Sequence, residues 1–115
     1  MTYDEGLSQR MRDALDGLPG VEEKKMMGGV CFLIDGHMVS GAHRDKKTGE
    51  GWFMFRVGKD QQSEALEMPG VSEMIMGGRK MGGLVQAMEE LEDAGFANLR
   101  SLALAFVGTL PPKIK

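Results

Sequence analysis

The feature of this sequence that most restricts its fold is a period-two alternation of bulky apolar side chains from Val30 to Val57. Alternation of this kind predicts strands that bury one face of a sheet. The dipeptide Asp35-Gly36 separates two apolar runs, and such a two-residue link predicts a tight antiparallel hairpin, because both turn positions need positive φ. The centre of the chain is therefore expected to form an antiparallel sheet.

The register of that hairpin can be counted outward from its turn. The predicted pairs are Ile34 with His37, Leu33 with Met38, Phe32 with Val39 and Cys31 with Ser40. The side chains expected to share the core side of the sheet are Val30, Phe32, Ile34 and Val39. In the next predicted strand, Trp52–Val57, Phe53 and Phe55 alternate with Trp52 and Met54 in the same way.

Helices are expected before, between and after these strands. The other predicted segments are a helix over 2–17 with a capping box from Thr2 and Glu5, a strand over 21–27, a short helix from Asp60 to Met68, a hairpin of 71–76 with 81–88, and a last helix whose apolar stripe runs from Phe96 to Leu110. Strands this closely spaced leave no room for parallel crossovers. The sequence therefore predicts a two-layer α+β fold, a mostly antiparallel sheet with helices packed on one face, in the order α-β-β-β-β-α-β-β-α.

Length and charge restrict the class of protein further. A chain of 115 residues has the size of one domain, so residues 1–115 are expected to fold as a unit. A net charge of −3 gives no basic field to attract phosphates, which argues against direct nucleic-acid binding. The longest apolar run, Leu102–Val107, is far shorter than the roughly 20 residues of a membrane-spanning helix, and the N-terminus lacks an apolar signal region. We therefore expect a cytoplasmic protein.

Residues suited to metal binding or nucleophilic catalysis form no recognisable set. His37 and His43 lie on one predicted strand, roughly 20 Å apart at about 3.3 Å per residue. Cys31 is expected on the opposite side of the sheet from both, without a neighbouring base. We therefore predict no metal site, no cofactor and no catalytic residue.

A glycine-rich basic segment at 77–83 is a candidate small-ligand site. Its glycines would let backbone amides approach a phosphate, and Arg79 and Lys80 would supply positive charge. The segment lacks the Gly-Lys-Ser/Thr ending of a P-loop, and a strand rather than a helix is predicted after it. Two interpretations follow: the site of a phosphate-binding or small-ligand protein, an enzyme included, or a bulged loop that uses glycine for positive φ.

A candidate protein-contact surface lies on the other face of the predicted strand at 52–57. Trp52, Met54 and Arg56 share that face, and tryptophan, methionine and arginine are enriched at protein interfaces. The alternative is that a helix of the same chain covers it. The acidic cluster from Glu89 to Asp93 is either a solvated surface or a second contact surface for a basic partner.

Several short motifs, taken in order, resemble a known family. Lys25-Met26-Met27-Gly28-Gly29 is similar to the basic-Met-aromatic-Gly-Gly motif of the TfoX N-terminal domain family, with Met27 in place of the aromatic residue. Trp52–Val57 with Arg56 resembles the family's next strand, Gly78-Arg79-Lys80-Met81 its later hairpin, and Leu110-Pro111-Pro112-Lys113 the tail after its closing helix. The resemblance extends over nearly the whole chain.

This resemblance implies a two-layer α+β domain and, through the competence regulators of the family, a role in assisting transcription by contact with another protein. Those regulators carry a second, C-terminal helical domain, and this chain ends before one, so a stand-alone copy of the N-terminal domain is expected. The family supplies no catalytic residue for these positions. We therefore expect a non-enzymatic bacterial interaction module that binds a protein partner or pairs with itself.

Overall fold

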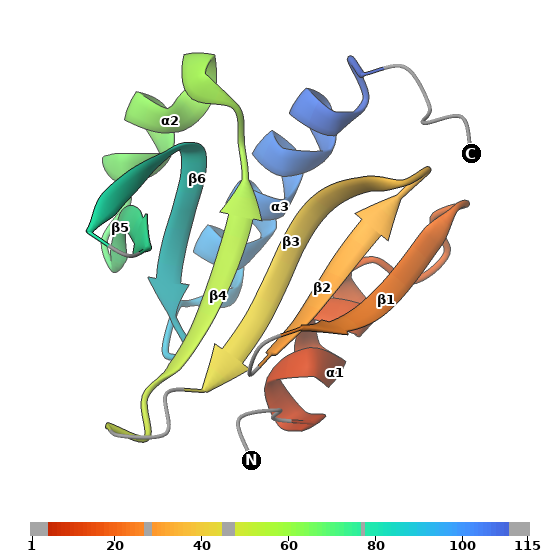
Figure 1. Ribbon diagram of the computed structural model, residues 1–115, viewed down its shortest axis with the longest axis horizontal. Coiled ribbons are helices and arrows are strands. Elements are labelled where there is room, and N and C mark those ends of the chain that lie inside the picture. The colour runs from red at the N-terminus through yellow and green to blue at the C-terminus, as the bar shows by residue number, and fades with distance from the viewer. Residues whose placement is uncertain (1–4, 27–28, 45–47, 77, 111–115) are drawn as a thin grey trace.

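The computed structural model describes residues 5–26, 29–44, 48–76 and 78–110, which form three helices and a six-stranded sheet (Figure 1). In chain order the elements are α1 (Glu5–Ala14), β1 (Val21–Met26), β2 (Gly29–Ile34), β3 (His37–Arg44), β4 (Gly51–Arg56), α2 (Lys59–Leu66), β5 (Val71–Met76), β6 (Arg79–Met88) and α3 (Asp93–Val107). The predicted α+β class and the predicted order of elements are confirmed.

The sheet is open, with its strands in the order β1-β2-β3-β4-β6-β5, and every described pair of neighbours is antiparallel. Strand β6 lies between β4 and β5 because α2 carries the chain from β4 to the outer edge, from which the β5–β6 hairpin returns. Figure 1 shows α1 and α3 behind the strands, and Ala65 of α2 belongs to the same buried core as these two helices. The described helices therefore cover one face of the sheet.

One hydrophobic core fills the space between the sheet and the helices. Phe53 and Phe55 of β4 are fully buried, and their ring centroids lie 5.0 and 5.5 Å from that of Phe96 in α3, both in edge-to-face geometry. Met11 of α1 is equally buried in this core. The apolar faces predicted for the first and last helices, and for the strand at 52–57, are confirmed.

The predicted hairpin register is right next to the turn and wrong beyond it. The pairs Ile34 with His37 and Leu33 with Met38 are confirmed, but Phe32 pairs with Ser40 and Cys31 with Gly41. Val39 is an extra residue on β3 at this point, a β-bulge, and both Val39 and Ser40 are buried. Because the bulge shifts the register by one residue, the outward-facing Cys31 lies beside Gly41 instead of Ser40.

Some predicted boundaries also differ. Helix α1 ends at Ala14 rather than at residue 17, and the structure does not describe Thr2 or the side chain of Glu5, which were expected to cap it. The N-cap of α2 is Gly58, with φ of 83°, because the chain turns sharply as it leaves β4; Asp60 lies in the first turn and is not the cap. Strand β6 begins at Arg79, two residues earlier than predicted.

Candidate interaction surface

The face of the sheet that turns away from the helices is called the open face below. Strand alternation places on it the following residues of the four inner strands: Cys31, Leu33, Met38, Gly41, His43, Trp52, Met54, Arg56, Leu84, Gln86 and Met88. Met54 and Leu84 are buried hydrophobic residues that do not belong to the core cluster, which agrees with a position on the opposite face. The open face is therefore mostly apolar, although no described helix covers it.

Met54 fills the centre of the open face. Its side chain lies across Gly41 of β3, because a Cβ built on Gly41 would stand 3.3 Å from Met54 Cε and 3.8 Å from Cys31 Sγ. Met54 is 7% exposed, and no described helix lies over it. A glycine at position 41 thus lets a long apolar side chain lie flat, and the centre of the face becomes smooth and apolar.

The three residues predicted for this surface lie on one strand but have different surroundings. Trp52 is half-buried and paired across the sheet with His43 and Met88. Arg56 lies where β3 separates from β4. Its guanidinium stands 5.3 Å from the centre of the Phe106 ring, and Nη1 donates to the Met38 carbonyl oxygen at 3.4 Å. Trp52 and Met54 thus belong to the apolar part of the open face, whereas Arg56 lies at its end with its charged group turned toward α3.

The other predicted site residues, Arg79 and Lys80, begin β6, and their side chains lie outside the part of the chain that the structure describes. The glycines that follow them line a pocket. Its lining residues are Arg56, Val57, Gly58, Lys59, Asp60, Gln61, Gly82, Gly83, Ala105, Phe106 and Thr109, and its volume is about 520 Å³. The structure therefore brings part of the glycine-rich segment together with Arg56, which lies on another strand.

Close backbone packing accounts for one of these glycines. Gly83 has φ of 83°, and its carbonyl oxygen accepts hydrogen bonds from the amides of Val57 at 2.9 Å and Gly58 at 3.0 Å. A Cβ on Gly83 would come within 3.3 Å of Gly58 Cα. Positive φ and this close approach both require glycine here, which favours the bulged-loop interpretation of the segment.

The histidines and the cysteine are arranged differently from the prediction. His37 lines a shallow pocket with α3 residues such as Leu104 and Val107, whereas His43 is on the open face. The expectation that Cys31 lies on the opposite side of the sheet holds for His37 but is wrong for His43, because the bulge at Val39 turns His43 to the face of Cys31. Among the described residues, no three His, Cys, Asp or Glu side chains are grouped as metal ligands would be.

Partial burial raises the pKa of the Cys31 thiol above its ordinary value through desolvation of the thiolate. Because the thiolate is the reactive form, alkylation of Cys31 at neutral pH is expected to be at least about threefold slower in the folded chain than in urea. The rate should rise steeply only at alkaline pH, above the range of an unfolded thiol. The rate of Cys31 alkylation by iodoacetamide, measured by mass spectrometry at several pH values, tests this expectation. Equal rates for the folded and the unfolded chain at pH 7 would contradict it.

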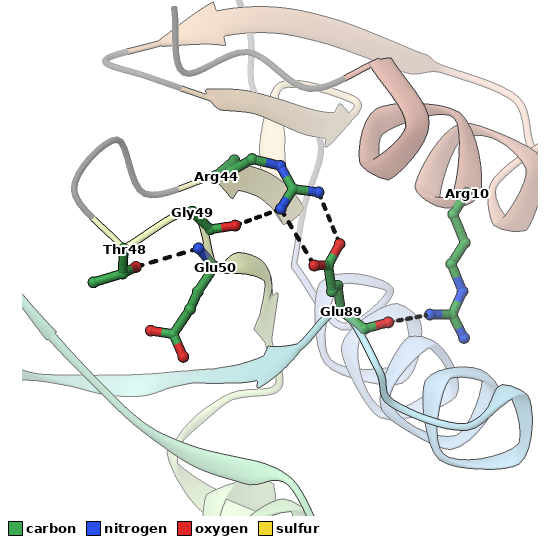
Figure 2. Close-up of polar contacts among 6 residues, drawn as sticks. All are labelled: Arg10, Arg44, Thr48, Gly49, Glu50 and Glu89. Atoms are coloured by element: carbon green, nitrogen blue, oxygen red, sulfur yellow. Dashed lines mark hydrogen bonds and ion pairs between the residues drawn. The ribbon is translucent and has the colours of Figure 1, made fainter.

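The predicted acidic cluster is partly neutralised within the chain. Figure 2 shows Arg44 forming a fork with Glu89, at 2.8 and 3.2 Å, and donating to the Gly49 carbonyl oxygen at 2.6 Å. Asp93 accepts from Arg10 at 3.0 Å. Glu89 therefore holds the β3–β4 connection against the end of β6 and is not a free carboxylate for a basic partner.

Arg10 of α1 has a structural role that the sequence did not reveal. Its guanidinium lies 4.4 Å from the centre of the buried Phe96 ring, and it donates to the carbonyl oxygens of Glu89 at 3.1 Å and Leu91 at 2.8 Å (Figure 2 draws the first of these bonds). Arg10 thus ties α1 to the connection between β6 and α3. No local sequence pattern marks Arg10 for this role, since its partners come from the far end of the chain.

Replacing Arg10 by methionine is expected to lower the free energy of unfolding by about 1–3 kcal/mol, because two backbone carbonyls lose a charged donor while the apolar stem is kept. Arg12→Met in the same helix is the matched control. Arg12 binds both carboxylate oxygens of Glu23, at 2.5 and 2.8 Å, with each side chain about one-third exposed, and we expect a solvent-screened pair of this kind to contribute about 1 kcal/mol. Urea unfolding of both variants measures the two losses in the free energy of unfolding. Equal losses would contradict a special role for Arg10.

These features define an α+β open-faced sandwich with an apolar outer surface, and none of its described helices is long and apolar enough to cross a membrane. The chain belongs to the TfoX N-terminal domain family, whose model matches residues 13–105. A search of curated proteins and a search of solved structures each found no match. The family is linked to competence regulation, which coarsely supports a regulatory accessory role.

Proposed function

We propose that this protein is a non-enzymatic regulatory accessory protein that acts by binding another protein through the open face. The observation that carries the proposal is the apolar character of that face: on the inner strands its side chains are apolar apart from His43, Gln86 and Arg56. The described side chains of this face are buried or half-buried, and a contiguous apolar surface that no described helix covers marks a contact site.

The membership of the chain in a family linked to competence regulation supports a regulatory rather than a metabolic role for this contact. The single tryptophan of the chain, Trp52, lies at one end of the open face, and tryptophan is the residue type most enriched at binding hot spots. A contact centred on Trp52 and Met54 is therefore the arrangement we propose.

Affinity capture from the source cell tests this function with three forms of the protein. The wild type, Trp52→Ala and the control Ala97→Lys, which changes an exposed residue of α3, are used as bait. A partner held by the wild type and the control but lost with Trp52→Ala supports the proposal. Transcript levels in a deletion strain should then be restored by the wild type and the control but not by Trp52→Ala. Identical capture by all three, or no transcript change on deletion, would contradict it.

A second candidate function has one observation in its favour. Arg56, Lys59 and the glycines 82 and 83 line the same pocket, so a small anionic ligand is the alternative. A thermal-shift screen with inorganic phosphate, nucleotides and phosphorylated metabolites tests it, because a ligand that binds the folded state raises the melting temperature by mass action. A shift that Lys59→Ala abolishes supports the anionic ligand, and a flat screen excludes it as the function.

A further inference from the structure

We infer that the open face is also a self-association surface, and that two copies of this chain stack sheet against sheet with Met54 and Gly41 near the centre of the contact. This inference rests on the proposed function, since both require the open face to be a contact surface. It adds the identity of one occupant, a second copy of the chain.

The charge of the open face favours a copy of itself. On β2, β3, β4 and β6 the one charged residue among the described outward-facing side chains is Arg56 at the strand end, and the edge strand β1 adds Glu22 and Lys24, one charge of each sign. A face with an uncharged centre and one charge of each sign on its edge strand selects neither an acidic nor a basic partner. It also meets its own copy without like-charge repulsion, although the chain carries a net charge of −3.

The shape of the open face also suits a two-fold contact. Its centre is low, because Gly41 has no side chain and Met54 lies flat over it. Half-buried side chains stand around this centre, with Trp52 and Met88 on one side and Leu33 and Met38 on the other. In an isologous dimer each copy presents the same surface, and methionines adapt to such a contact because their side chains are flexible.

The area of the whole outward face of the sheet, the open face together with the edge strands β1 and β5, sets the expected strength of the dimer. Six strands about 4.8 Å apart, with about six residues each at about 3.4 Å per residue, give a face of roughly 600 Å². Two copies then enclose about 1,200 Å², which is the lower limit of stable protein interfaces. The expected dimer is therefore reversible, with a dissociation constant that is roughly micromolar.

Sedimentation velocity from about 1 µM to about 500 µM tests the inference, since this range brackets a micromolar dissociation constant. The wild type should pass from monomer to dimer, with a blue shift in the fluorescence of Trp52 over the same range. Leu33→Lys places a charge on the open face opposite Glu22 of β1, so the monomer keeps a favourable cross-strand pair while the dimer buries a cation. It should weaken dimerisation at least about tenfold.

Ala97→Lys adds the same charge to an exposed position of α3, on the other side of the molecule, and should leave dimerisation unchanged. If Leu33→Lys fails to fold, as judged by circular dichroism, Met88→Gln takes its place on β6. A wild type that is monomeric at every concentration overturns the inference, as does equal weakening by the open-face variant and the control. A strict monomer that still captures a partner through Trp52 would leave the proposed function standing, so the two failures are distinguishable.

Discussion

Replacing Phe96 by alanine is expected to lower the free energy of unfolding by about 3–5 kcal/mol, the range for truncating a buried phenylalanine. Phe96 is 6% exposed, and its ring meets both Phe53 and Phe55 edge to face. Arg10 lies over the same ring, so the substitution also removes its cation–π contact. Alanine at position 96 would leave a cavity where α3, α1 and the sheet meet.

Urea unfolding followed by circular dichroism measures this loss. Ser101→Ala on the exposed side of α3 is the control and should change the stability by less than about 0.5 kcal/mol. Phe96→Leu keeps part of the buried volume and should lie between the two, which covers the case in which Phe96→Ala does not fold. A loss for Phe96→Ala within about 1 kcal/mol of the control would show that α3 does not seal the sheet in this way.

The second large effect is expected at Gly58, where alanine should cost about 3 kcal/mol or more. Gly58 combines φ of 83° with ψ of 154°, a region open essentially to glycine, and holding alanine in this conformation costs about 1–3 kcal/mol. A Cβ at this position would also overlap the ring of Phe106, with Cε1 only 2.8 Å away. Overpacking of that kind adds about 1–3 kcal/mol.

Gly17 provides a matched control for the steric part of this loss. It has φ of 85°, and no atom lies within 4 Å of the Cβ that alanine would add. Gly17→Ala is therefore expected to cost about 1–2 kcal/mol, the conformational share alone. In the double variant Gly58→Ala with Phe106→Ala, part of the loss at position 58 should be recovered. Equal losses at positions 17 and 58 would contradict the close approach of Phe106 to the backbone.

The local parts of the fold could be predicted from the sequence because their causes are local. The Asp35-Gly36 turn, the alternation around Phe53 and the apolar stripe of α3 each depend on neighbouring residues. The bulge at Val39 could not be predicted in this way. Ser40 pairs with Phe32 on one side and with Phe55 of β4 on the other, so the register depends on a strand that the turn does not specify.

The candidate surface could be predicted only in part, for a related reason. Alternation within one strand placed Trp52 and Met54 together, and the structure confirms that they share a face. Leu33, Met38 and Met88 join that face through strand pairings between separate hairpins, which no single segment encodes. No single segment shows whether a helix covers this face. The answer depends on the path of α2 between β4 and β5, which is a property of the assembled sheet.

The claim on which the functional proposals depend is that the helices leave one apolar face of the sheet uncovered. Limited oxidation of dilute protein by hydrogen peroxide, mapped by mass spectrometry, tests it most directly. We expect Met38 and Met88, half-buried on the open face, to oxidise well before Met11, which is 0% exposed in the core. Oxidation of Met11 as early as that of Met38 and Met88 would contradict the account.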